Sequence, residues 1–164
     1  MSVPIGAKGE ARMVVTDDKT AAAIGSGSVR VFATPWMIAM MELASCNALA
    51  PYYESGQSSV GTKLDVSHDA ATPVGWRVRA EAEVIEVDRR RIVLSVTAWD
   101  GAGLIGKGTH ERFLIDAVVQ GFLISEDQHH IRSVIQGRVF PHDRIFCCRM
   151  QQTAFPFHQF LFFF

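Results

Sequence analysis

Three polar side chains, Thr34, Glu42 and His68, have the chemistry needed for general acid–base or nucleophilic catalysis. Glu42 is the only charged residue between Arg30 and Glu54, and it lies within a strongly apolar segment. A carboxylate in such surroundings must be hydrogen-bonded, paired, or protonated because of desolvation. It is therefore a candidate catalytic group, and the alternative is a structural carboxylate that reaches water from a helix edge.

Thr34 and His68 each have an ordinary structural explanation beside the chemical one. Thr34 precedes Pro35, a pairing that predicts Thr34 as the N-cap of a helix. A hydroxyl at that place could also bind a carboxylate or a substrate carbonyl. A lone histidine is more often a satisfied core or surface residue, yet histidine is also the commonest general acid or base. His110 and Arg112 lie on a predicted strand, where such polar side chains usually face solvent.

One helix and five strands would position these side chains. Residues 36–50 have apolar residues at helical spacing and almost no charge, which predicts a buried helix. Residues 21–28 are rich in small residues and predict a mobile loop. Alternation and turn signals predict strands, with possible bulges at Gly106 and Gly108, over residues 10–16, 59–68, 76–84, 92–99 and 104–115. A buried helix followed by an antiparallel meander indicates an α+β fold in which a sheet wraps a central helix.

The 164 residues divide near position 116. Residues 117–164 contain no lysine and nine of the eleven phenylalanines. We therefore expect a domain over residues 1–116 and a Phe-rich C-terminal extension over residues 117–164, for which the sequence indicates no structure.

Composition excludes several classes of function. A formal net charge of -1 gives no electrostatic reason to expect nucleic acid as a partner. No apolar run reaches the ~20 residues that span a bilayer, and the N-terminus lacks the layout of a signal peptide. The three cysteines are too few for a disulfide framework, which predicts a reducing cytosol. The histidines and cysteines beyond residue 116 match no standard zinc spacing, so no metal site is expected.

Short motifs spread over residues 8–116 together resemble one family. In chain order they are Val31-Phe32-Ala33-Thr34, Met41-Glu42, Ala50-Pro51-Tyr52, Val60-Gly61-Thr62, His68-Asp69-Ala70-Ala71-Thr72-Pro73 and Gly106-Lys107-Gly108-Thr109-His110-Glu111-Arg112. The threonine, the glutamate eight residues later and the histidine twenty-six residues further on stand in register with the THER motif. The sequence resembles the hot-dog acyl-CoA thioesterases, and most closely their fluoroacetyl-CoA thioesterase-like branch.

This resemblance implies a fold, an assembly and a set of roles. The fold is a hot-dog fold, a long helix enclosed by a curved antiparallel sheet, paired as a homodimer with active sites usually at the subunit interface. The resemblance implies an acyl-CoA substrate, with neither a metal nor a bound cofactor. Thr34, Glu42 and His68 occupy the catalytic positions, Gly61 offers a backbone N–H to the thioester carbonyl, and Arg112 contacts the substrate. Glu42 would either attack the thioester to form an anhydride or activate a water, and the sequence leaves both routes open.

The sequence departs from the specialised members of this branch before Thr34. Those members carry aromatic groups over the acyl site, where this chain reads Gly25-Ser26-Gly27-Ser28. A short- or medium-chain acyl-CoA is therefore the expected substrate. The alternative from another class is a non-catalytic protein that binds acyl-CoA or serves as a scaffold. A hot-dog hydratase ranks lower because the sequence shows no Asp/His hydratase signature.

Overall fold

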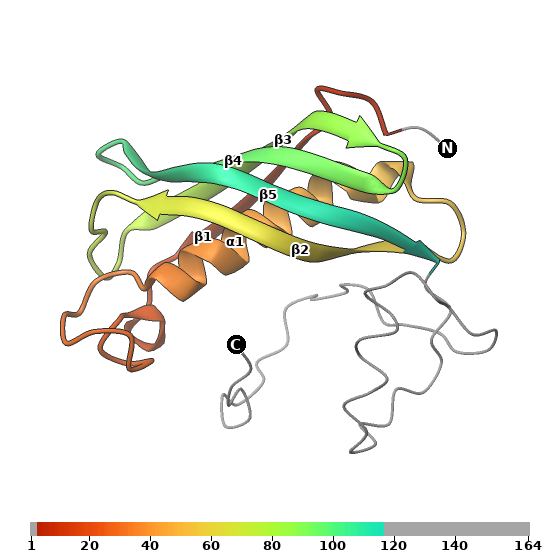
Figure 1. Cartoon of the computed structure of the whole chain (residues 1–164). Coiled ribbons are helices and arrows are strands. Elements are labelled where there is room, and N and C mark those ends of the chain that lie inside the picture. Colours follow the sequence, from red (N-terminus) through yellow and green to blue (C-terminus); the bar gives the residue numbers. More distant parts are fainter. Residues whose placement is uncertain (1–2, 117–164) are drawn as a thin grey trace, which may run out of the picture.

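The helix α1 (Thr34–Leu49) lies along the inner face of a five-stranded sheet in the computed structural model, which describes residues 3–116 (Figure 1). The sheet has the order β1-β3-β4-β5-β2, and every neighbouring pair is antiparallel. Short 3-10 turns, η1 and η2, flank the helix in sequence. The remaining bounds are β1 (Lys8–Val14), η1 (Asp17–Lys19), η2 (Ala50–Tyr52), β2 (Gln57–His68), β3 (Arg77–Asp88), β4 (Arg91–Trp99) and β5 (Leu104–Asp116).

The predicted α+β architecture, a curved sheet wrapped around one helix, is confirmed. All five predicted strands are present, and residues 21–28 form turns and bends as expected. β3 runs four residues beyond its predicted end, to Asp88. Its register shifts between Val84 and Glu86, which leaves Ile85 47% exposed. This irregularity breaks the alternation on which the prediction relied. The predicted extension over residues 117–164 lies outside the described residues.

β1 packs very closely against α1, and a glycine makes this possible. A Cβ on Gly9 would lie 2.2 Å from the backbone nitrogen of Ala48 and 2.3 Å from the carbonyl oxygen of Ala44. The contact is therefore between strand backbone and helix backbone. The adjoining core contains Met37, Met40, Met41 and Leu49 from the helix and Ile92, Leu94 and Val96 from β4. This packing fixes the helix that carries two of the candidate catalytic residues.

The helix is not buried on every side, contrary to the prediction. α1 is apolar around its whole circumference, but the sheet covers only part of it. Ala39 is exposed, and the large side chain of Leu43 is 37% exposed. An apolar helix face left open in this way is typical of a contact surface.

Gly106 and Gly108 were both predicted as bulge positions, but only Gly106 lies at an irregularity of the sheet. Gly106 borders a register shift, because Ala98 pairs with Gly106 whereas the next residue, Trp99, pairs with Leu104. Gly108 stands in regular register with both neighbouring strands, so the bulge prediction is wrong there. A Cβ on Gly108 would lie 2.0 Å from the carbonyl oxygen of Asp65. Close backbone approach explains this glycine.

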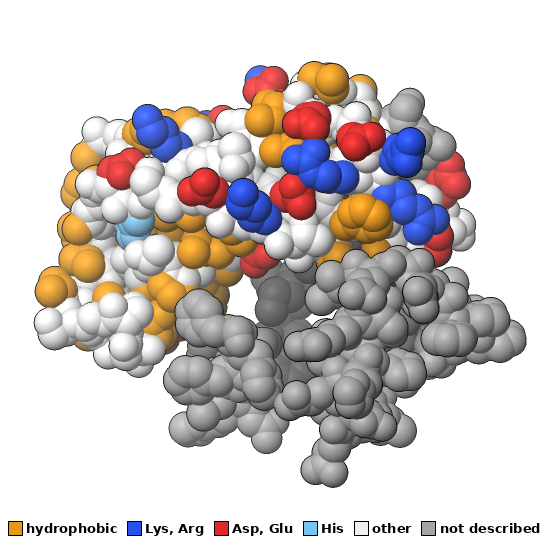
Figure 2. Space-filling view, viewed as in Figure 1, with side chains coloured by type: hydrophobic (Ala, Val, Ile, Leu, Met, Phe, Trp, Pro, Cys, Tyr) orange, Lys and Arg blue, Asp and Glu red, His pale blue; other side chains and the backbone are white. Residues whose placement is uncertain are grey.

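Charges of both signs alternate over the outer face of the sheet that Figure 2 shows. Ion pairs such as Arg91–Glu86 and Arg91–Glu111, both 2.6 Å, link neighbouring strands there. No single-sign patch of the kind that binds nucleic acid is seen on this face. Within residues 3–116, no helix is both long and apolar enough to cross a membrane.

Candidate active site

Thr34 contacts His68 rather than capping its own helix. Ala33 is the N-cap of α1, with no side-chain capping bond, and Thr34 is the first helical residue. The Thr34 hydroxyl lies 2.8 Å from Nδ1 of His68, at the end of β2. The N-cap prediction is therefore wrong by one residue. Because the hydroxyl is not needed at the helix terminus, it can orient the histidine ring.

The ring of His68 is held on a second side by an aromatic contact. The edge-to-face contact with buried Phe32 has a centroid separation of 6.4 Å and an interplanar angle of 78°. Desolvation by burial is the main cause that lowers the pKa of His68. Its Nε2 is buried and has no hydrogen-bond partner among residues 3–116. His68 is thus a neutral imidazole near pH 7 with one ring nitrogen uncommitted, which suits proton transfer.

Glu42 lies at the border of the part of α1 that the sheet covers. Its side chain is 43% exposed, so of the alternatives left open the carboxylate reaches water from the helix edge. The carboxylate nevertheless has a specific neighbour, because its Oε1 lies 3.8 Å from Nε2 of His110. A side chain in this position can reach a ligand in solvent and still be oriented by the protein.

Gly61 faces the same two side chains from β2. A Cβ at this position would lie 2.9 Å from Nε2 of His110 and 3.1 Å from Oε1 of Glu42. Gly61 is exposed, and the register of β2 shifts directly after it, between Gly61 and Lys63. A bulge of this kind redirects backbone groups at functional sites. The absence of a side chain therefore opens the space beside the carboxylate.

Two residues of β5 complete this side of the site, and both face inward, contrary to the prediction. His110 and Arg112 were expected to face solvent, but they are 0% and 5% exposed. The Arg112 guanidinium donates hydrogen bonds from Nε to the Ser59 hydroxyl and from Nη2 to the Ser59 carbonyl, each 2.8 Å. Tyr53 Oη lies 2.6 Å from the same hydroxyl. The predicted contact of Arg112 with substrate stays a prediction.

His110 is a functional candidate, although it was predicted to face solvent. Its Nδ1 lies 3.0 Å from the Ser45 hydroxyl, and its Nε2 has no hydrogen-bond partner in the described part of the chain. Desolvation, followed by the positive charge of Arg112, lowers its pKa to about 4. A usable signal was present, because His110 shares the strand face of Arg112, two residues on.

The candidate residues form two groups in one protomer. Thr34 contacts His68, while Glu42 lies beside Gly61 and His110. Eight residues separate Thr34 from Glu42, a rise of about 12 Å along a helix. The structure therefore places the members of each group in contact with one another, but it does not bring Glu42 into contact with His68.

Neither a metal cluster nor the hollow on the outer face of the sheet belongs to this site. No group of three or more His, Cys, Asp or Glu side chains within residues 3–116 is arranged to hold a metal ion.

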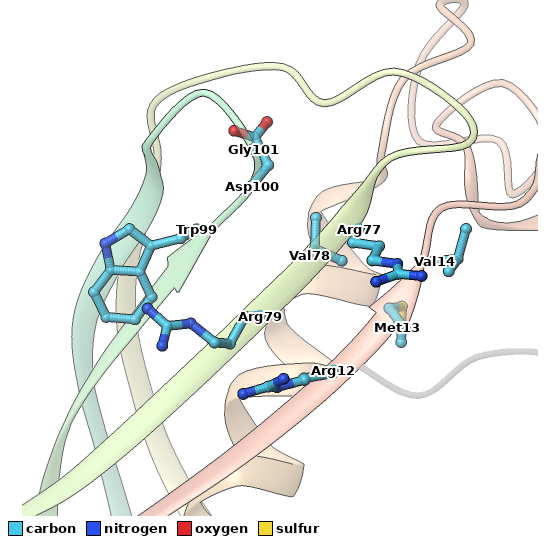
Figure 3. A pocket seen from close by; sticks show the side chains of 9 residues that line it. All are labelled: Arg12, Met13, Val14, Arg77, Val78, Arg79, Trp99, Asp100 and Gly101. Carbon is cyan, nitrogen blue, oxygen red and sulfur yellow. The ribbon is translucent and has the colours of Figure 1, made fainter.

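Figure 3 shows a hollow between β1, β3 and the end of β4, where Arg12, Arg77 and Arg79 surround apolar side chains. Arg77 and Arg79 alternate with buried Val78, so they project away from α1. This hollow contains none of the candidate catalytic residues.

Comparisons with known proteins agree on a family. A family model described as fluoroacetyl-CoA-specific thioesterase matches residues 15–118. A fluoroacetyl-CoA thioesterase from Streptantibioticus cattleyicolor is 49% identical over 85 residues, which are 52% of this chain and 61% of the relative. The match thus spans less than two thirds of that relative's length.

Solved structures show the same similarity. A variant of the fluoroacetyl-CoA-specific thioesterase, crystallised with fluoroacetate and CoA, is 39% identical, with a TM-score of 0.65 over 69% of this chain and 95% of that one. A thioesterase superfamily member from Thermus thermophilus is 27% identical, with a TM-score of 0.67 over 82% of this chain and 92% of that one. A hot-dog-like protein from Thermanaerovibrio acidaminovorans, 24% identical with a TM-score of 0.63 over 69% of this chain and 84% of that one, supports the hot-dog fold.

Proposed function

This chain belongs to the fluoroacetyl-CoA-specific thioesterase family, and we propose that it hydrolyses short- or medium-chain acyl-CoA to the free acid and CoA. Two observations carry the proposal: Thr34 pairs with His68 at 2.8 Å, and a half-exposed Glu42 faces Gly61. Acyl transfer from a thioester needs a nucleophile, a stabilised oxyanion and a proton for the departing thiolate. These residues offer one group for each requirement.

Each residue takes one role in the proposed reaction. Glu42 either attacks the thioester carbonyl carbon or takes a proton from the attacking water. The backbone N–H of Gly61 donates a hydrogen bond to the oxyanion that forms when the carbonyl carbon is attacked. His68 relays a proton from water to the thiolate that leaves when the C–S bond breaks, so the ring ends neutral as it began, and Thr34 keeps the ring in place. Water supplies the hydroxyl of the acid and the hydrogen of the thiol, so the atoms balance.

We also propose that the active site is shared between the two subunits of a homodimer. Support comes from the separation of the two residue groups within one protomer and from the exposed apolar face around Leu43. A second copy that covers this face would bury the helix and could place His68 of one protomer near Glu42 of the other. A two-fold interface would generate two equivalent sites.

Mixed dimers test this arrangement directly. Glu42→Gln and His68→Ala proteins are each expected to be inactive. If each site draws one residue from each subunit, a mixed dimer contains one intact site, and refolding the two variants together restores part of the activity. If both residues of a site come from one subunit, every site in the mixture carries a defect and no activity returns. Sedimentation analysis establishes the dimer independently.

Thiol release from a panel of CoA esters tests the reaction itself. The panel runs from acetyl- and fluoroacetyl-CoA to medium-chain acyl-CoA, with His68→Ala measured in parallel. Hydrolysis that depends on His68 supports the thioesterase, and the preferred ester gives the substrate class. The turns over residues 25–28 contain no aromatic side chain, so we expect no selection for a fluoroacetyl group. Saturable binding of these esters without thiol release would instead favour the non-catalytic acyl-CoA-binding protein.

We assign this activity to residues 1–116, in the cytoplasm. Support for the boundary comes from the family model, whose match ends at residue 118. A protein that ends at residue 116 should fold and hydrolyse the same esters as the full chain. An insoluble or inactive truncated protein would place the boundary elsewhere.

A further inference from the structure

His110 has one ring nitrogen that the fold leaves without a partner. The side chain is 0% exposed, yet Nε2 makes no hydrogen bond within residues 3–116. A buried polar atom without a partner is costly, so a group that can pair with it is expected nearby. The carboxylate of Glu42, whose Oε1 is 3.8 Å away, is the acidic group that faces it. Gly61 stands beside both atoms without a side chain to separate them.

The other ring nitrogen decides which tautomer the site favours. The Ser45 hydroxyl lies 3.0 Å from Nδ1 of His110 and 2.8 Å from the carbonyl oxygen of Met41. If Ser45 donates to Met41, Nδ1 must carry the ring proton, and the lone pair of Nε2 faces the carboxylate. If Ser45 donates to Nδ1, the N–H of Nε2 points toward the carboxylate instead. The first arrangement leaves the buried lone pair of Nε2 without a donor. The second gives each polar hydrogen a partner, at the cost of setting the Ser45 oxygen against the Met41 carbonyl oxygen 2.8 Å away.

The Met41 carbonyl does not need the Ser45 hydroxyl. Ser45 is four residues further along α1, so its backbone N–H is the regular helical partner of that carbonyl. Turning the hydroxyl to Nδ1 therefore leaves the carbonyl paired, and its cost is the contact between the two oxygens. Because the pKa of His110 is lowered to about 4, the ring is neutral near pH 7 and carries one proton, which this arrangement places on Nε2.

We infer that His110 is a positioning residue for Glu42: Ser45 donates to Nδ1, and the Nε2–H donates to the Glu42 carboxylate. Closing the gap to a hydrogen bond of about 2.9 Å needs a movement of about 1 Å in a side chain that is 43% exposed. The buried ring, packed between α1 and β5, would then fix the orientation of a carboxylate that solvent leaves free to rotate. The inference rests on the proposed function for its catalytic consequence, but the hydrogen bonds can be tested without it.

Two substitutions of His110 separate positioning from packing. Glutamine places an N–H three bonds from Cβ, as Nε2 is in histidine, so His110→Gln can still donate to Glu42. Asparagine places its amide two bonds from Cβ, as Nδ1 is, so His110→Asn keeps the contact with Ser45 alone. We expect His110→Asn to lower kcat about 10²-fold with KM unchanged, and His110→Gln to recover most of that loss. Equal losses in both variants, or a normal kcat in His110→Asn, would overturn the inference.

A spectroscopic measurement on the unmodified protein does not depend on turnover. The ¹⁵N chemical shifts of the His110 ring at neutral pH report which nitrogen carries the proton. We expect the proton on Nε2, and in Ser45→Ala a shift toward the Nδ1 tautomer. A proton on Nδ1 in the unmodified protein would refute the hydrogen bond to Glu42 even if the enzyme is active. If the expected tautomer is found but the protein hydrolyses no acyl-CoA, the hydrogen bond is supported and the proposed thioesterase activity is wrong.

Discussion

The hydroxyl of Thr34 lies 2.8 Å from Nδ1 of His68, although thirty-four residues separate the two in the sequence. This contact joins the first residue of α1 to the last residue of β2. It exists because the helix begins at Thr34 itself, with Ala33 as the N-cap. The threonine side chain thus points to the strand end rather than to its own helix terminus, and it holds the imidazole through Nδ1.

Removing that hydroxyl should impair catalysis more than stability. Thr34→Val keeps the branched shape but cannot hydrogen-bond to His68, so the ring loses its orientation. We expect kcat to fall about 10²-fold, since small displacements of reacting groups cost that much. Thr34→Ser retains the hydroxyl and should stay within a few-fold of the parent. Equal kcat values for the valine and serine variants would remove Thr34 from the mechanism.

Glu42 should be indispensable whether it acts as nucleophile or as base. Glu42→Gln preserves size and hydrogen-bonding capacity but removes the charge, so we expect turnover to fall by about 10²–10⁴-fold with the fold intact. Glu83→Gln is the matched control, because its exposed ion pair with Lys8, at 3.2 Å, lies on the sheet away from α1. Thiol release and circular dichroism of both variants check the result. Unchanged turnover in Glu42→Gln would leave the carboxylate a structural role only.

Much of this fold could be predicted because it rests on local patterns. The apolar segment before Pro51 and the alternation around Val78 specify a helix and a half-buried strand without reference to the rest of the chain. The order β1-β3-β4-β5-β2 could not be obtained in this way, because it depends on long-range pairing. The exposed side of α1 was missed for a related reason. Composition shows that a helix is apolar but not how far a sheet will cover it.

The site was only partly predictable. Thr34, Glu42 and His68 were singled out by residue type and position, and Gly61 through a resemblance, while His110 was predicted to face solvent. The prediction followed the general rule that polar strand residues face solvent, which fails where such a side chain finds a buried partner. The contact of His110 with Ser45, sixty-five residues away, is a tertiary relationship that no local pattern encodes.

Gly61 should not tolerate even the smallest side chain. The Cβ of Gly61→Ala would lie 2.9 Å from Nε2 of His110 and 3.1 Å from Oε1 of Glu42, so the carboxylate must move away. We expect kcat to fall about 10²-fold. Gly101→Ala is the control, because its Cβ would make ordinary contacts of 3.7 Å with the Trp76 ring. Similar activity in the two alanine variants would show that the space beside Glu42 is not used.

Gly9→Ala should act on stability instead of chemistry. Its Cβ would lie 2.2 Å from the backbone nitrogen of Ala48, and a helix backbone cannot yield as a flexible side chain can. We expect the free energy of unfolding to fall by about 1–3 kcal/mol or more. Gly27→Ala, whose Cβ would meet only the Cβ of Ala21 at 3.5 Å, should be nearly neutral. Urea unfolding of the two variants measures the difference, and equal midpoints would contradict the close contact of β1 with α1.

Burial of neutral His110 should make the protein less stable in acid. The pKa of His110 is about 4 in the folded protein and has an ordinary value of 6.5 in the unfolded chain. Between these values the unfolded chain binds more protons, so the free energy of unfolding falls as the pH falls through this window. The stability gained, relative to acid, because His110 is neutral reaches its full value above about pH 6.5, and it amounts to at most about 3 kcal/mol. His68, whose pKa is also lowered by burial, acts in the same direction.

The difference between the parent protein and His110→Gln isolates this contribution, because carboxylates titrate in both proteins. Urea unfolding over a pH series from neutral to about pH 4 should give a shallower decline for the variant, since glutamine does not titrate. Identical pH dependence in the two proteins would mean that His110 is protonated as easily in the fold as in the unfolded chain. In that case burial beside Arg112 would not hold the ring neutral below about pH 6.5, and His110 would not cause the loss of stability in acid.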